Sequence, residues 1–170
     1  PVSKDGVVDL KTLEKWLKEC APRVGMVAIM AANNETGVIQ PYQEIGAICR
    51  QYAVPFFSDT TQLIGKTSFN FAQSSKDYAV LSGHKIGALT GSGILLAKDP
   101  STVRAIIIGG GQEKGKRGGT QNYLGNETLA IALKHFESHL AQIKILGEHR
   151  QAFESEIKRR FPSAVIMGEK

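Results

Sequence analysis

The sequence predicts an α/β fold in which a mainly parallel sheet is flanked by helices. Short apolar runs alternate along the chain with segments whose apolar residues recur at helical spacing. Residues 25–32 form a continuous apolar run, which is typical of a strand buried on both faces. Strands that alternate with helices favour a parallel sheet. With 170 residues, 42% of them hydrophobic and 22% charged, the chain is long enough to bury a sizeable core.

The first 108 residues carry signals for two helices and several strands. Asp9 can cap a helix that runs through Lys18. Pro41 suits the first position of a second helix, which should reach about Tyr52. After the run at 25–32, we expect further strands at residues 54–58, 78–81, 93–97 and 104–108.

The pattern changes in the last third of the chain. Residues 109–119 are rich in glycine, and residues 124–146 have apolar side chains at helical spacing. We expect Gly147 to interrupt this helix and a second helix to follow to about Phe161, where Pro162 ends it. Ser163 begins a short run, to residue 167, that resembles the first strand of a further unit.

This change of pattern predicts two units. Residues 1–124 would belong to the domain that contains the sheet, and residues 125–170 would form a connecting helix and the start of a small C-terminal domain. The chain begins with Pro1 rather than Met, so we expect it to start inside a longer gene product or after a cleavage.

Composition and charge argue against several classes of function. The net charge is +5, yet the densest basic cluster, at Lys114, Lys116 and Arg117, lies among glycines without interleaved aromatic residues, so we expect no nucleic-acid partner. No apolar run approaches the roughly 20 residues that a membrane span needs. Cys20 and Cys49 lack the spacing of metal ligands, so no metal site is expected. Low cysteine usage is consistent with a cytoplasmic protein.

Polar segments follow the expected strands. In an open parallel sheet, ligands bind outside the carboxyl ends of the strands. Segments with donors, acids or nucleophiles stand after four of the expected strands, at residues 33–37, 59–62, 82–85 and 109–113. We therefore expect these segments to form a binding site.

Lys85 is the most informative residue of these segments. A lysine placed directly after an apolar strand can be a nucleophile that holds an aldehyde as a Schiff base. Asp59 ends an earlier apolar run, and pyridoxal phosphate (PLP) requires a lysine on its aldehyde and an acid on its ring nitrogen. The alternative is that Lys85 is a solvated surface charge and that Asp59 is a turn or cap residue.

Four motifs, taken together, resemble those of one enzyme family. They are Ala-Asn-Asn-Glu-Thr-Gly-Val-Ile-Gln-Pro at 32–41, Asp59-x-x-Gln62-x-x-Gly65-Lys66, Ser82-Gly83-His84-Lys85, and Gly-Gly-Gly-Gln-Glu-x-Gly-x-Arg-x-Gly-Thr at 109–120. In order and spacing they are similar to those of cysteine desulfurases, which are PLP enzymes of the class V aminotransferase group with fold type I. The resemblance covers most of residues 1–125, which would then be part of the large PLP-binding domain.

The resemblance implies a role for three residues around the cofactor ring. Lys85 would bind the aldehyde of PLP and later move protons. Asp59 would pair with the protonated pyridine nitrogen. Gln62 would form a hydrogen bond with the 3-oxygen of the ring. As an ordinary alternative, Gln62 could be a surface amide.

Four further residues are implied in binding phosphate and substrate. Ser82 and His84 would bind the cofactor phosphate, with Gly83 allowing a close backbone approach. Thr120 would reach the phosphate bound in the other subunit of a homodimer. Asn34 would line the cofactor and help hold the substrate carboxylate. Their structural alternatives are a strand-end hydroxyl, a core histidine, a helix cap and a turn residue, respectively.

The implied activity is removal of sulfur from L-cysteine, which gives L-alanine and a persulfide for iron–sulfur clusters or another sulfur acceptor or scaffold protein. In the family, the persulfide cysteine lies in a later segment, and neither Cys20 nor Cys49 matches it. We therefore interpret the chain as a central fragment that is inactive, or nearly so, by itself. Two alternatives remain open: a selenocysteine lyase or other class V lyase, and a non-catalytic dimerisation or binding fragment.

The chain also departs from the family pattern. Phe57 stands where the family usually has histidine, and Thr60 stands where it usually has alanine. Residues 87–91 and 117–120 differ from the usual turns, which we expect to loosen the surroundings of the cofactor.

Overall fold

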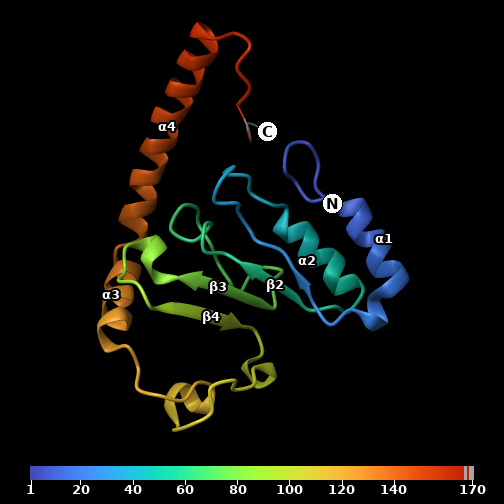
Figure 1. Cartoon of the computed structure of the whole chain (residues 1–170), viewed down its shortest axis with the longest axis vertical. Coiled ribbons are helices and arrows are strands. Elements are labelled where there is room, and N and C mark those ends of the chain that lie inside the picture. Colours follow the sequence, from blue (N-terminus) through green and yellow to red (C-terminus); the bar gives the residue numbers. More distant parts are fainter. Residues whose placement is uncertain (167, 169–170) are drawn as a thin grey trace.

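A computed structural model of the chain, which describes residues 1–166 and 168, contains a mixed four-stranded sheet with helices packed against it (Figure 1). The strands follow one another across the sheet in chain order and are β1 (Val27–Ala28), β2 (Phe56–Asp59), β3 (Tyr78–Ser82) and β4 (Gly93–Ala97). The first three are parallel, whereas β4 is antiparallel to β3. The predicted α/β fold with a mainly parallel sheet is therefore confirmed.

The regular part of β1 is shorter than the apolar run at 25–32, but its backbone stays paired with β2 beyond Ala28. The Ile29 N–H donates to the Phe57 carbonyl at 3.1 Å, and the Ala31 N–H donates to the Asp59 carbonyl at 2.8 Å. This pairing carries β1 alongside β2 as far as the carboxyl end of the sheet. The other two predicted strands of the parallel part agree with β2 and β3 to within two residues.

The strand predicted at 104–108 does not form, and this prediction was wrong. The described structure places no strand beside β4 on its outer edge. Ile106 is 94% exposed and Ile108 is 88% exposed, so this apolar run has no layer to pack against. The run has the composition of a buried strand, but burial requires a neighbouring element that composition alone does not reveal.

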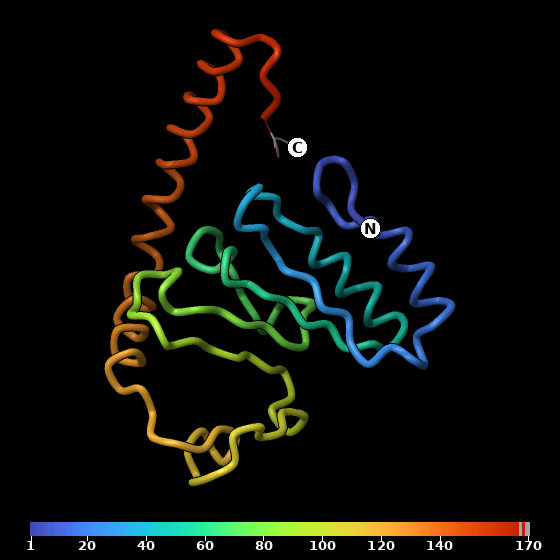
Figure 2. The backbone as a smooth tube through the Cα atoms, viewed as in Figure 1, coloured from blue at the N-terminus to red at the C-terminus, as the bar shows by residue number. Residues whose placement is uncertain are grey.

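The two N-terminal helices pack on one face of the sheet, where Figure 2 shows their backbones running side by side. Helix α1 (Leu10–Cys20) begins as expected after Asp9, whose carboxylate accepts hydrogen bonds from the backbone N–H groups of Lys11 and Thr12. Helix α2 (Tyr42–Gln51) begins one residue after Pro41. Together with β1 and β2 they bury one apolar cluster: Leu17, Val27, Ile45, Cys49, Val54 and Phe56.

The C-terminal helices break at a different residue from the one predicted. Helix α3 (Tyr123–Lys134) ends just before His135, and α4 (Phe136–Arg160) starts directly after that residue. The His135 carbonyl accepts hydrogen bonds from the Ser138 hydroxyl and the His139 N–H, so the chain begins a new helix at this point. Gly147, which we expected to interrupt a helix, lies inside α4, because a glycine lowers helix propensity without forbidding the helix.

The end of the chain agrees only partly with expectation. Helix α4 ends at Arg160, close to the predicted Phe161 and before Pro162. Residues 163–166 are not a strand, and Met167 lies outside the described residues. Leu129 of α3 packs with Ile64 and Leu81, whereas α4 has no buried residue. The predicted division into two units between residues 124 and 125 stays a prediction.

Among the described residues, no helix combines the length and the apolar character that crossing a membrane would require.

Lys76 is buried in the core, which the sequence did not reveal. Its Nζ atom lies 3.3 Å from the centroid of the Tyr42 ring and 5.2 Å from that of Phe69, and it has no hydrogen-bond partner among the described residues. Burial lowers the pKa of Lys76 to about 8, and the positive charge of Lys98 acts in the same direction. The two aromatic faces stabilise the cation in part.

We expect the substitution of glycine by alanine to have opposite effects in two helices. At Gly46 in α2, an added Cβ would lie 2.3 Å from the Ser75 Cβ and 2.6 Å from the Ser75 carbonyl oxygen. At Gly147 in α4, nothing lies within 4 Å. Gly46→Ala should therefore lower the free energy of unfolding by about 1–3 kcal/mol. Gly147→Ala should raise helical content, with a gain of up to about 1 kcal/mol. Circular dichroism during urea unfolding measures both effects, and a stable Gly46→Ala variant would contradict this packing.

We also expect Lys76→Met to stabilise the chain at neutral pH. Between pH 8 and 10.5, the folded pKa and the ordinary pKa of Lys76, the unfolded chain binds more protons than the folded chain, so the wild-type free energy of unfolding rises with pH in this window. At pH 7 the variant should gain on the order of 2 kcal/mol, and the gain should shrink as the pH approaches 10.5. Urea unfolding at both pH values measures this, with Lys11→Met as the exposed control. Parallel pH profiles for the Lys76→Met variant and the wild type would show that the amine is not perturbed.

Candidate functional site

The carboxyl ends of the three parallel strands meet at one edge of the sheet and bring three of the predicted polar segments together. Asp59 pairs with Val80 in the register of β2 and β3, and Ser82 ends β3 two residues later. Because side chains alternate along a strand and parallel partners point the same way, Asp59 and Ser82 project from the same face of the sheet. The fully buried Ser58 points to the opposite face.

Asp59 is held at this edge by the residue that follows it. The Thr60 N–H and the Thr60 hydroxyl both donate to the Val80 carbonyl oxygen, at 2.9 and 2.7 Å. Thr60 is fully buried, so the end of β2 is attached firmly to β3. The Asp59 carboxylate accepts a hydrogen bond from the Thr61 N–H at 2.9 Å and is otherwise exposed. The threonine that departs from the family pattern therefore fixes the position of the acid.

Gln62 lies in the turn after Asp59 and contacts a lysine to which the sequence analysis gave no role. The Lys66 ammonium donates to Oε1 of Gln62 at 3.0 Å. Burial lowers the pKa of Lys66, and the charge of Lys85 lowers it further, because the two cations are close enough to repel each other. The spacing of four residues within a motif was the signal in the sequence that could have pointed to Lys66.

The Ser82–Lys85 segment forms a short 3-10 helix, η2 (Gly83–Ile86), which ends at Gly87 with a left-handed φ of 95°. Oγ of Ser82 and Nδ1 of His84 are hydrogen-bonded at 2.8 Å. His84 and Lys85 are both exposed. At Gly83 a Cβ would lie 2.5 Å from Ser92 Oγ. Position 83 therefore requires a glycine because its backbone lies close to Ser92, the residue just before β4.

The turn after β1 places Asn34 on the surface. The preceding residue, Asn33, shapes this turn, because its side-chain oxygen accepts hydrogen bonds from the N–H groups of Glu35 and Thr36, at 2.8 and 2.9 Å. Asn34 is exposed and therefore free to contact a ligand. The predicted site residue Asn34 and the residue that shapes the loop, Asn33, are thus neighbours in the sequence.

The fourth predicted segment does not reach this edge by way of a strand, which corrects the expectation for residues 109–113. Ala97 pairs with Tyr78, so the antiparallel β4 carries the chain back to the amino end of β3. The chain then forms a loop that leaves the sheet and returns to α3 (Figure 1). Thr120 lies exposed in this loop, where Arg117 donates to the Gly119 and Thr120 carbonyls.

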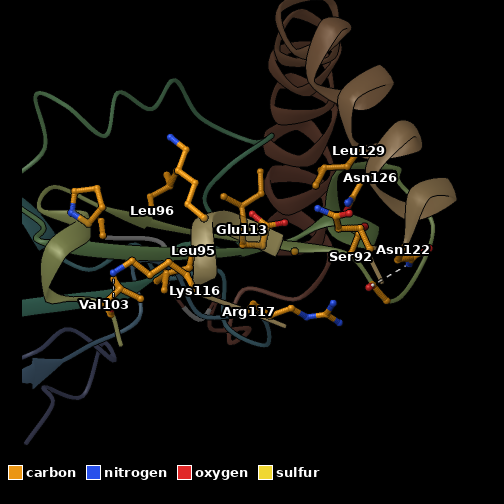
Figure 3. A pocket seen from close by; sticks show the side chains of 17 residues that line it. Ser92, Leu95, Leu96, Val103, Glu113, Lys116, Arg117, Asn122, Asn126 and Leu129 are labelled. Atoms are coloured by element: carbon orange, nitrogen blue, oxygen red, sulfur yellow. Dashed lines mark hydrogen bonds between the residues drawn. The ribbon is translucent and has the colours of Figure 1, made fainter. Parts of the chain in front are cut away.

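A cavity of about 870 Å³ lies between β4 and this loop (Figure 3). Its lining includes Leu95, Glu113, Arg117 and Leu129, together with Lys116, whose ammonium donates to the Val103 carbonyl at 2.6 Å. None of the seven predicted site residues lines it. The residues at the ends of the parallel strands are called the strand-end site; they are Asn34, Asp59, Gln62, Ser82, His84 and Lys85. None of them lines the cavity, which is therefore separate from this site. In the described part of the chain, His, Cys, Asp and Glu side chains form no group of three that could hold a metal ion.

Sequence comparisons with known proteins identify relatives of this chain. The chain is 39% identical over 154 residues to "Cysteine desulfurase, mitochondrial" of Arabidopsis thaliana, a match that covers 87% of this chain and 33% of that protein. It is 43% identical over 122 residues to "Cysteine desulfurase IscS" of Rickettsia prowazekii, covering 71% of this chain and 29% of that protein. The chain thus spans about a third of the length of these relatives.

Solved structures give the same result. The structure of a NifS-like protein from Rickettsia africae superposes with a TM-score of 0.89 at 34% identity, covering 99% of this chain and 47% of that one. The family model described as "Aminotransferase class-V" matches residues 1–160. Since this match includes all four strands and every residue of the strand-end site, the chain belongs to the class-V aminotransferase family.

Proposed function

We propose that this chain is the PLP-binding part of a cysteine desulfurase, which converts L-cysteine to L-alanine and a persulfide for iron–sulfur clusters or another sulfur acceptor. The observation that carries the proposal is the set of polar groups at three adjacent strand ends, in a chain whose relatives are named cysteine desulfurases. The protein would act in the cytoplasm.

The chemistry of this donor set fits PLP. A carboxylate (Asp59), an amide (Gln62) and an amine (Lys85) follow neighbouring strands and match the pyridine nitrogen, the 3-oxygen and the aldehyde of the cofactor. When bound, PLP supplies an electron sink for the substrate carbon. Lys85 would hold the cofactor at its aldehyde, and its amine would be placed to move protons. Asp59 would keep the proton on the ring nitrogen, because a nearby carboxylate favours the charged pyridinium.

Ser82 and His84 would bind the phosphate. Their hydrogen bond at 2.8 Å orients the hydroxyl and the imidazole toward each other before any ligand arrives. Asn34 would hold the substrate carboxylate from the exposed turn after β1. Thr120 is exposed in the loop before α3, and we propose that it completes the phosphate site of the partner subunit in a homodimer.

We expect borohydride reduction in the presence of PLP to label Lys85. The chain would be incubated with PLP, reduced, digested and mapped by mass spectrometry. Lys66 is the sharpest competitor, because its lowered pKa leaves more of its amine unprotonated and reactive. An adduct on Lys66 or another lysine in place of Lys85 would overturn the assignment.

Two variants complete this experiment. Lys85→Met should abolish the specific adduct. Asp59→Asn should keep the adduct on Lys85 but weaken PLP binding about tenfold or more, because the charged partner of the pyridinium is lost. Lys11→Met, which alters an exposed lysine of α1, serves as the matched control.

A further inference from the structure

We propose that Lys66 is a positioning residue, which fixes the side-chain amide of Gln62 so that its N–H groups face the cofactor. This inference rests on the proposed function, because it assigns a task within the same PLP site. Lys66 itself is not expected to touch the reacting atoms.

The contact between the two side chains determines which way the amide points. An ammonium group only donates hydrogen bonds, so the atom of Gln62 that lies 3.0 Å from Lys66 Nζ must be the carbonyl oxygen Oε1. The Nε2 group is then turned away from Lys66. Among the residues that the structure describes, Gln62 Nε2 has no acceptor. It is therefore available to donate to an acceptor such as the 3-oxygen of the cofactor.

The backbone keeps Gln62 and Lys66 at the right separation. The N–H groups of Leu63 and Ile64 both donate to the Thr60 carbonyl at 2.9 Å, and the Lys66 N–H donates to the Leu63 carbonyl at 3.1 Å. Thr60 is itself attached to Val80 of β3. The turn that carries both side chains is thus connected directly to the sheet that carries Asp59.

The same turn contacts the segment that contains the lysine nucleophile. At Gly65, which has a left-handed φ of 87°, a Cβ would lie 2.8 Å from the Ile86 side chain, and Ile86 follows Lys85 directly. Lys66 is also close enough to Lys85 for their charges to interact. A lysine elsewhere on the surface would lie neither beside the Ile86 segment nor within range of the Lys85 charge. Lys66 therefore lies where it can hold Gln62 while leaving the aldehyde to Lys85.

The test combines a spectrum of the loaded protein with a double-mutant cycle. A hydrogen bond from Gln62 to the 3-oxygen favours the deprotonated form of the Lys85-bound cofactor. Loss of this hydrogen bond should therefore raise the cofactor pKa that is measured from the change in the visible absorption band with pH. We expect Lys66→Met to raise this pKa by about one unit and to weaken PLP binding about tenfold. Lys66→Arg, which keeps a donor, should restore both, and Lys11→Met should change neither.

The cycle separates positioning from a simple effect of charge. In a Gln62→Ala background, Lys66→Met should have no further effect if Lys66 acts through Gln62. Equal shifts in both backgrounds would overturn the proposal. Without cofactor, the ¹H–¹⁵N signals of the Gln62 side-chain amide should move in Lys66→Met and not in Lys11→Met, and unchanged signals would also overturn it. Failure of PLP to attach to Lys85 in the unsubstituted chain would instead refute the proposed function.

Discussion

The pairing of β2 with β3 is the constraint on which the site depends. It sets Asp59 opposite Val80 and leaves Ser82 beyond it on the same face of the sheet. The two hydrogen bonds from Thr60 to the Val80 carbonyl fix this register at the point where the strands end. A shift of one residue would turn Asp59 into the core face, which Phe56 and Ser58 occupy. The acid, the amide and the amine thus owe their common location to a few main-chain contacts rather than to one another.

Much of the fold was predictable where the signal is local. The carboxylate of Asp9 and the N–H groups that it caps are neighbours in the sequence, and β4 was predicted at its observed bounds. The errors came where the outcome depends on distant partners. The isoleucines at 106–108 look like a strand, yet the structure gives them no strand to pair with and no layer to pack against. Gly147 looks like a break, but α4 has no packing there that forces one.

In the candidate site, too, local signals were predictable from the sequence and contacts with distant partners were not. The order and spacing of motifs pointed to Lys85, Asp59 and Gln62, because Asp59 and Gln62 stand at the end of one expected strand and Lys85 stands just after the next. The supporting contacts were not predictable, since they join side chains to groups whose positions only the fold defines. Lys66 stood inside a quoted motif without a role, and the hydroxyl of Thr60 counted only as a departure from a family pattern. The burial of Lys76 between Tyr42 and Phe69 had no signal in the sequence at all.

Helix α4 shows how a long element can persist without a core of its own. Its 25 residues rise about 37 Å, yet none of them is buried. Ion pairs within the helix join Arg150 to Glu154, and Glu156 to both Arg159 and Arg160. Solvated pairs of this kind are weakened by salt. The stability of α4 is consequently more sensitive to ionic strength than the hydrogen-bonded geometry around the sheet.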